Sequence, residues 1–143
     1  MSFRPDELQE ILSIYKAESE EHLQKLNAGL LRLEKEPRRQ ESLEEIFREA
    51  HSLKGAARMI GFGAVEKVAH SLEDLFGAGK RGELAFEREV FDVICASLGA
   101  IGRLTADWLA NPAKPSPPVG DLTERVRGLL SRPPDDRAPA PGG

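Results

Sequence analysis

The apolar side chains of the first 35 residues recur at steps of three and four, the spacing that places side chains on one face of an α-helix. The stripe consists of Leu8, Ile11, Leu12, Tyr15, Leu23, Leu26, Leu30 and Leu33, with His22 on the same face. A β-strand would alternate apolar and polar side chains instead, so the pattern predicts one long helix over residues 6–35. Asp6, which follows Pro5, is expected to cap its start, and Pro37 is expected to end it.

Three further segments repeat this spacing and predict helices over about 41–60, 64–78 and 87–110. Helix-breaking residues separate them: Gly61 and Gly63, then Gly77, Gly79 and Gly82, and finally Asn111 and Pro112. No segment shows strand alternation, and the connections between the first four helices are short. We therefore expect an all-α chain in which residues 6–110 form an antiparallel four-helix bundle.

A shorter fifth helix is expected over residues 121–131, where Asp121 is a candidate N-cap and Glu124 its capping-box partner. We expect this helix to pack across the bundle and to complete a domain of residues 1–131. Residues 132–143 are rich in proline and glycine and have almost nothing apolar to bury. This composition predicts a flexible linker, which suits a domain followed by others in a longer polypeptide.

The charge and composition disfavour several classes of function. The net charge is -4 and both signs are interspersed through the 143 residues, unlike the basic stripe of a nucleic-acid-binding protein. There is no signal-like start and no run of about 18 apolar residues, which predicts a cytoplasmic protein without direct membrane contact. Cys95 has no second cysteine to pair with, and its apolar helical setting predicts a small buried residue.

The residues with a chemical role are expected in the second helix, in the run EAHSLKGAA at 49–57. At about 100° per residue, His51 projects roughly 130° from the middle of the apolar stripe and faces solvent. Lys54 can reach back to an anion on the imidazole, and Arg58 adds a second positive charge. Gly55 leaves the neighbouring surface bare, although glycine inside a helix costs about 1 kcal/mol relative to alanine. An exposed histidine taken alone is usually a surface residue without a task, but these neighbours favour an imidazole that handles a phosphoryl group.

Residues 51–57 and the following MIGF, residues 59–62, resemble the signature of histidine phosphotransfer (HPt) domains. They are most similar to the N-terminal phosphoacceptor domain of CheA-type chemotaxis histidine kinases, and the likeness extends from the first helix into the fourth. The resemblance implies that His51 accepts the γ-phosphoryl group of ATP and passes it to an aspartate of a response regulator. The chain departs from a common family pattern at Ala56 and Ala57, which preserve access but offer no hydroxyl group.

A neutral imidazole attacks phosphorus through one nitrogen, so its second nitrogen should be held by a carboxylate or carbonyl group, and we expect a carboxylate on a facing helix. His70 and Glu73, three residues apart on the third helix, share one face. The resemblance implies the same pair, and we therefore expect Glu73 to orient His51, with Lys54 and His70 as supporting residues that hold the network or offset phosphoryl charge. The alternative is that His70 and Glu73 lie on a solvated helix face.

A metal site is disfavoured by the sequence. His51, His70 and Glu73 could in principle hold Zn²⁺, but two histidines on different helices without a further pair of ligands are weak evidence. His22 lies on the apolar stripe of the first helix, where a hydrogen-bonded residue at the edge of the core is more typical than a ligand. We therefore expect neither a metal nor a cofactor in this domain.

The sequence contains neither a Walker loop nor a kinase catalytic loop, so it provides the phosphorylated substrate and not the kinase catalyst. We expect a separate histidine kinase catalytic domain, which uses ATP and Mg²⁺, to phosphorylate His51, and a response-regulator receiver domain to take the phosphoryl group. Ala56, Met59 and Phe62 are candidates for the receiver docking patch, and the isolated domain is expected to be a monomer. Two alternatives remain open: a shuttle HPt domain of a multistep phosphorelay, and a helical adaptor without chemistry.

Overall fold

The computed structural model describes residues 4–132, and all regular secondary structure within them is helical. Its helices are α1 (Pro5–Lys35), α2 (Gln40–Met59), α3 (Gly63–Lys80), α4 (Arg88–Ala110) and α5 (Gly120–Leu130). The all-α class is therefore confirmed, and each helix lies close to its predicted bounds. The linker expected at 132–143 falls outside the described residues, apart from Arg132.

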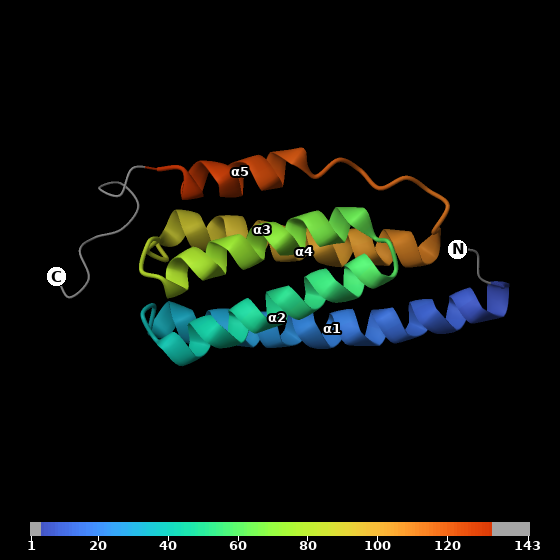
Figure 1. Ribbon diagram of the computed structural model, residues 1–143, viewed down its shortest axis with the longest axis horizontal. Helices are drawn as coiled ribbons and strands as arrows, with labels where there is room; N and C mark the ends of the chain where they lie inside the picture. The colour runs from blue at the N-terminus through green and yellow to red at the C-terminus, as the bar shows by residue number, and fades with distance from the viewer. Residues whose placement is uncertain (1–3, 133–143) are drawn as a thin grey trace.

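Helices α1 to α4 form a bundle in which sequential neighbours run antiparallel and α1 also packs against α4 (Figure 1). Helix α5 lies on α3 and α4, on the side of the bundle away from α1 and α2 (Figure 1). The largest fully buried side chains include Leu26, Leu33, Leu43, Ile46, Leu53, Leu72, Leu75, Phe76, Ile94 and Ile101. Removing such apolar surface from water, at about 25 cal/mol per Å², is the main favourable term in folding.

Two helices begin without the side-chain caps that the sequence suggests. Helix α1 starts at Pro5, whose missing N–H and fixed φ suit the first turn of a helix, and Asp6 makes no capping bond. Helix α5 starts one residue before Asp121 and has no side-chain cap. Glu124 instead accepts a hydrogen bond from Arg127, one turn along, at 2.5 Å. The predicted capping box is therefore wrong, because Asp121 lies inside the helix and not at its boundary.

The glycines near the end of α3 do not interrupt it. The helix continues through Gly77 and Gly79. A Cβ at Gly79 would clash with the ring of Phe86, whereas a Cβ at Gly77 would be in ordinary contact with the ring of Phe47. The predicted loosening of the chain at these two glycines is therefore wrong, and the absence of a side chain at Gly79 makes room for Phe86. The turn after the helix uses Gly82, whose positive φ of 75° is a conformation that glycine adopts without strain.

Cys95 lies on the outer face of α4 and is exposed, so the prediction of a buried cysteine is wrong. Ile94 is fully buried, and one further residue of helix rotates the side chain by about 100°, toward solvent. By length and composition α4 is apolar enough to span a membrane, and 44% of that stretch is buried within the protein. Its buried side chains, among them Ile94 and Ile101, line the bundle core, which accounts for this composition.

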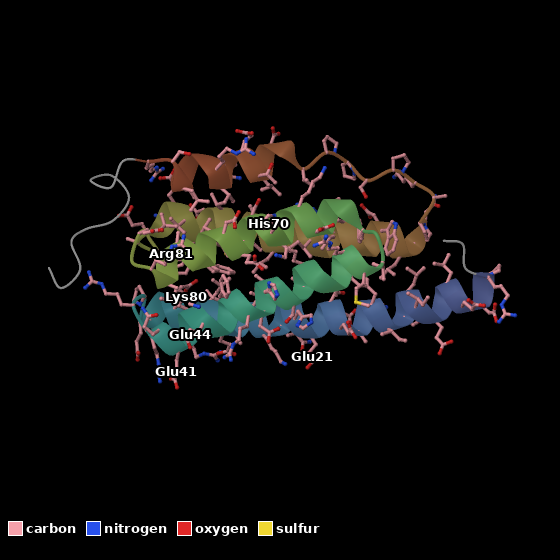
Figure 2. All side chains as sticks on the ribbon, viewed as in Figure 1. Glu21, Glu41, Glu44, His70, Lys80 and Arg81 are labelled. Atoms are coloured by element: carbon pink, nitrogen blue, oxygen red, sulfur yellow. The ribbon has the colours of Figure 1, made fainter. Side chains whose placement is uncertain are left out.

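Charged side chains cover the outer surface of the bundle (Figure 2). Glu41 and Glu44 are exposed on α2, and at the end of α3 the Nζ atom of Lys80 lies 4.4 Å from the centroid of the Phe47 ring. Glu44 precedes His51 by two helical turns, so both side chains project from the same face of α2. The polar face of α2 is therefore the face that presents His51 to solvent.

Candidate functional site

His51 lies in the middle of α2 on the face turned away from the core, and 66% of its side chain is exposed. Ala50, Leu53 and Ala57 are fully buried and set the rotation of the helix about its own axis. Because each residue turns the helix by about 100°, this rotation directs His51 outward, as the spacing of the apolar residues predicts.

Glu73 on α3 binds both polar side chains of the α2 motif. The Nδ1 atom of His51 lies 2.5 Å from Oε2 of Glu73, and Nζ of Lys54 donates to Oε1 at 2.9 Å. Only 13% of the Glu73 side chain is exposed, so both contacts are partly shielded from water and stronger than they would be at a free surface. The expected contact between His51 and a carboxylate on a facing helix is present.

The surroundings of Glu73 keep its carboxyl group ionised. Burial by itself raises the pKa of this carboxyl, but the hydrogen bonds and charges of Lys54 and His51 outweigh burial and hold the pKa below its ordinary value of 4.5. An ionised carboxylate only accepts hydrogen bonds, so the proton of the 2.5 Å contact belongs to Nδ1 of His51. In the neutral ring, Nε2 then carries the free lone pair and is the nucleophilic atom.

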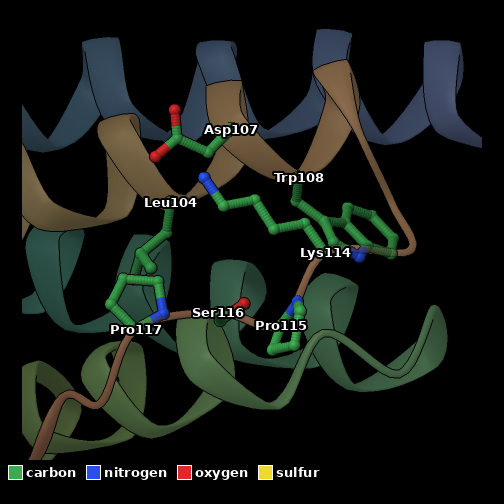
Figure 3. Close-up of a pocket in the computed structure, with 7 residues that line it drawn as sticks. All are labelled: Leu104, Asp107, Trp108, Lys114, Pro115, Ser116 and Pro117. Carbon is green, nitrogen blue, oxygen red and sulfur yellow. The ribbon is translucent and has the colours of Figure 1, made fainter.

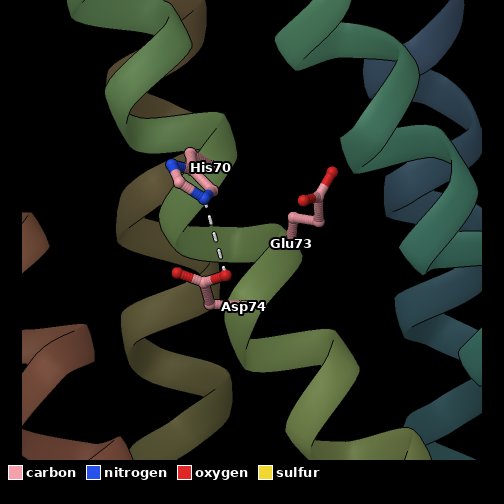
Figure 4. Close-up of side chains that lie close together, drawn as sticks. All are labelled: His70, Glu73 and Asp74. Carbon is pink, nitrogen blue, oxygen red and sulfur yellow. Dashed lines mark ion pairs between the residues drawn. The ribbon is translucent and has the colours of Figure 1, made fainter.

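His70 does not join this hydrogen-bond network. Its Nε2 atom lies 3.7 Å from Oδ1 of Asp74, and among the described residues no hydrogen bond links it to His51, Lys54 or Glu73. Figure 4 shows His70 and Asp74 facing each other on α3, while Glu73 points toward α2. The predicted contact of His70 with the network is therefore absent, because Glu73 is drawn across to α2 by its two partners there.

The residues predicted to form a docking patch do not all reach the surface. Met59 is 90% exposed and Ala56 is half-buried, so both are accessible on α2. Phe62 is buried, with its ring stacked on Trp108 at 4.5 Å between centroids and edge-on to Tyr15 at 6.4 Å. Phe62 therefore belongs to the core beneath the α2–α3 turn, and its assignment to the patch is wrong.

The surface beside His51 is open. A Cβ at Gly55 would meet no atom within 4 Å, so the glycine leaves a bare patch and makes no close contact with another helix. Arg58 is exposed, one turn beyond Lys54, and its Nε atom lies 3.9 Å from Oε2 of Glu66. At that distance the guanidinium group is held loosely and is able to turn toward an anion.

A second imidazole–carboxylate pair joins α2 to α1. The Nδ1 atom of His22 lies 2.6 Å from Oε2 of Glu49, and Nζ of Lys25 lies 3.9 Å from Oε1 of the same carboxylate. Both members of the pair are mostly buried. The sequence indicates a hydrogen-bonded His22 at the edge of the core but gives no sign of its partner, because 27 residues separate His22 from Glu49.

A cavity of about 220 Å³ lies away from His51, where the segment 114–117 passes the end of α4 (Figure 3). The ring of Trp108 lines it, and the side chain of Lys114 extends toward Asp107 (Figure 3). His51, Lys54 and Glu73 are not among the residues that line this cavity. His51 is instead exposed on an outer helix face, where a large partner can reach it.

Comparison with protein families assigns the chain to one family. Residues 10–106 match the family described as Hpt domain, and the match includes His51, Lys54 and Glu73. The chain belongs to the Hpt domain family. This Hpt domain is 36% identical over 123 residues to the chemotaxis protein CheA of Halobacterium salinarum, a match that covers 86% of this chain and 17% of that protein.

Another curated relative is named for gliding motility. The Hpt domain is 35% identical over 107 residues to the gliding motility regulatory protein of Myxococcus xanthus, covering 74% of this chain and 14% of that protein. The chain thus spans about a sixth of the length of the curated relatives that it matches. The similarity therefore concerns only one part of these larger proteins.

Solved structures share the fold of this Hpt domain. The CheA phosphotransferase domain from Thermotoga maritima superposes with a TM-score of 0.67 at 35% identity and covers 69% of this chain and 94% of that one. A histidine phosphotransfer domain of CheA superposes with a TM-score of 0.79 at 29% identity and covers 87% and 95%. The phosphorylated P1 domain of CheA3 from R. sphaeroides, solved in complex with CheY6, shares the fold with a TM-score of 0.75 at 23% identity and covers 85% and 96%.

Proposed function

We propose that this Hpt domain accepts and donates a phosphoryl group in two-component signalling and that His51 is the residue modified. The observation that carries the proposal is the contact between Nδ1 of His51 and the ionised carboxylate of Glu73, which leaves Nε2 free on an exposed surface. Lys54, bound to the same carboxylate, places a positive charge beside the ring.

In the accepting step, the lone pair of Nε2 forms a bond to the γ-phosphorus of ATP, the bond from that phosphorus to the bridging oxygen breaks, and ADP leaves. The ring then carries a positive charge that Nδ1–H shares, and Glu73 stabilises this charge through the 2.5 Å contact. In the donating step, an aspartate carboxylate attacks the phosphorus, the N–P bond breaks, and its electron pair returns to Nε2. The proton on Nδ1 stays in place throughout, so one carboxylate serves both steps.

The neighbours of His51 suit the arrival of a charged group on a second protein. A phosphoryl group adds between about 1.5 and 2 negative charges, which Lys54 and the loosely held Arg58 are placed to offset. The open surface at Gly55 and the small side chain of Ala56 allow another protein to approach the ring closely.

Two partner domains supply the remaining chemistry in this function. A histidine kinase catalytic domain uses ATP and Mg²⁺. The Hpt domain itself needs no cofactor. A receiver domain takes the phosphoryl group, and the complex of a phosphorylated P1 domain with CheY6 illustrates such a partner for that protein. We place both reactions in the cytoplasm.

Incubation of the chain with a CheA-type kinase catalytic domain, Mg²⁺ and ATP labelled in its γ-phosphate tests the assignment of His51. We expect an acid-labile label on the wild type and no label on His51→Gln, with circular dichroism showing that the variant is folded. Label retained by His51→Gln would contradict the assignment. Label obtained only from a phosphorylated receiver would indicate the shuttle role, and no label from either donor would indicate the adaptor.

The role of Glu73 is tested with Glu73→Ala, which we expect to slow phosphorylation of His51 by about 10²-fold because the ring loses the acceptor that selects its tautomer. Glu83→Ala removes an exposed carboxylate beyond the end of α3, where Glu83 pairs with Arg81, and serves as the matched control. Its phosphorylation rate should equal that of the wild type. Equal rates for Glu73→Ala and the wild type would rule out an orienting role for Glu73.

A further inference from the structure

His70 and Asp74 form an exposed pair on α3. They are four residues apart on one helix face, with 59% and 54% of their side chains exposed. Their nearest polar atoms, Nε2 and Oδ1, are 3.7 Å apart, too far for a hydrogen bond. Two ligands of one tetrahedral zinc ion, each about 2.0–2.1 Å from the metal, lie roughly 3.4 Å apart. The separation of His70 and Asp74 is therefore close to that of two ligands that share a metal ion.

Glu73 lies close enough to this pair to offer a third ligand atom once its side chain turns toward it. One ligand atom from each of His70, Glu73 and Asp74 can be chosen so that all lie within 4.8 Å of one another. The set combines one imidazole nitrogen with two carboxylate oxygens, a mixture that suits Zn²⁺, whereas Mg²⁺ prefers oxygen ligands alone. All three residues come from one helix, so the site does not depend on closing two helices around the ion.

We infer that His70, Glu73 and Asp74 bind Zn²⁺ on the surface of α3, and that the bound ion competes with His51 for the carboxylate of Glu73. The two oxygens of Glu73 are already engaged by His51 and Lys54. A zinc ion on His70 and Asp74 therefore gains its third protein ligand only when Glu73 turns from α2 toward the ion. Figure 4 shows the starting arrangement, in which Glu73 points away from the other two residues.

This competition couples zinc binding to the reactivity of His51. When Glu73 turns to the metal, Nδ1 of His51 loses its acceptor, and the ring no longer has a fixed tautomer. By linkage, the contact between His51 and Glu73 lowers the zinc affinity by the same factor by which bound zinc weakens that contact. The inhibitory part of the inference rests on the proposed phosphoacceptor function, whereas zinc binding itself does not.

Calorimetric titration of the 143-residue chain with ZnCl₂ tests the binding site. We expect one zinc ion per chain and a roughly tenfold or greater loss of affinity in Asp74→Asn, because a ligand is lost. Asp92→Asn, which removes the same charge from an exposed position on α4, should bind zinc like the wild type. Wild-type affinity in Asp74→Asn, or an equal loss in Asp92→Asn, would overturn the site.

His51→Gln separates this site from one centred on the phosphoacceptor. Because His51 competes for Glu73, its removal should leave zinc binding as tight as in the wild type or tighter. Loss of zinc binding in His51→Gln would place the ion on His51 and overturn the inference. This titration needs no kinase, so its result stands even where phosphorylation fails.

Phosphorylation by a kinase catalytic domain with Mg²⁺ and ATP, measured with and without ZnCl₂, tests the competition. We expect zinc at ten times the wild-type dissociation constant to slow labelling of the wild type about tenfold, and labelling of Asp74→Asn, with its roughly tenfold or greater loss of affinity, by no more than about twofold. Equal slowing of both proteins would show that zinc acts on the kinase and would overturn the coupling. Absence of label without zinc would instead contradict the proposed function and leave the binding titration to decide the site.

Discussion

At the scale of single residues, Glu73 sets the chemical state of His51. By accepting from Nδ1 it selects the tautomer in which Nε2 is free, and by binding Lys54 it holds a positive charge beside the ring. An exposed imidazole without these contacts would exchange between tautomers and rotate in water. In the proposed function, this partly buried carboxylate gives the surface histidine the properties of a nucleophile.

The contacts of Glu73 predict how its contribution to stability varies with pH. Its pKa is lower in the folded protein than the ordinary value of 4.5, so the folded state favours the ionised form. The stability from this preference is present above that ordinary value and is lost as the pH falls through the folded pKa. We expect wild type to exceed Glu73→Gln in free energy of unfolding at about pH 7, with the difference shrinking below about pH 4.5. Urea unfolding at several pH values measures this, and a constant difference would contradict it.

At the scale of helices, α2 is held by polar contacts on two sides. Glu73 reaches it from α3, and His22 reaches Glu49 from α1, so both rotation and register of α2 are constrained next to His51. The hydrogen bonds in these pairs require a defined geometry between donor and acceptor. Apolar packing, in contrast, tolerates small sliding movements of the helices.

The contact between α1 and α2 predicts a loss of stability in Glu49→Ala. Removing the carboxylate leaves His22 without its partner at a mostly buried site, which should lower the free energy of unfolding by about 1–3 kcal/mol. Glu44→Ala, an exposed position on the same helix, should change it by less than about 0.5 kcal/mol. Urea unfolding measures both variants, and equal values for the two would show that the pair contributes nothing.

Two helical glycines predict opposite effects of the same substitution. A Cβ at Gly29 would clash with the side chain of Ile46, so Gly29→Ala should destabilise the α1–α2 contact by about 1–3 kcal/mol, less the gain in helix propensity. Gly55 has open space, and Gly55→Ala should raise the free energy of unfolding by up to about 1 kcal/mol. Thermal unfolding compares the two variants. Stabilisation by Gly29→Ala would show that the helices move apart without cost.

At the scale of the whole molecule, the residues proposed to take part in phosphotransfer lie on α2 and α3, while α1, α4 and α5 pack against these two helices. Helix α5 lies outside the residues that match the Hpt family and covers α3 and α4 on the far side of the bundle (Figure 1). Its inward side chains, Val126 and Leu129, are buried there. We therefore expect α5 to contribute stability and not chemistry.

Leu129→Ala tests this division. Loss of a buried leucine should lower the free energy of unfolding by about 2–4 kcal/mol, while His51 is phosphorylated at the wild-type rate at temperatures where the protein is folded. Leu31→Ala removes the same atoms from a side chain that is 61% exposed and should have little effect on stability. A lower phosphorylation rate in folded Leu129→Ala would show that α5 takes part in the reaction.

The sequence by itself determined the helices and the direction of His51. Both depend on residues close together in the chain: the steps of three and four place apolar side chains on one face, and the same rotation turns His51 away from it. The resemblance of residues 51–57 to HPt domains likewise indicated the family that the comparison confirms. The small errors at the start of α5 and at Cys95 are local ones, within one turn of the correct position.

Which side chains meet was decided by the tertiary structure, and the sequence indicated the contact between Glu73 and His51 only through the family resemblance. The tertiary structure turned Glu73 toward α2 and left His70 opposite Asp74, although His70 has acidic residues at both three and four positions along the helix. It also paired His22 with Glu49 across two helices. These contacts depend on the rotation and register of packed helices, which the whole core sets through many side chains distant in sequence. The spacing of residues along one helix indicates which way each side chain faces, but it does not indicate which side chain of another helix it meets.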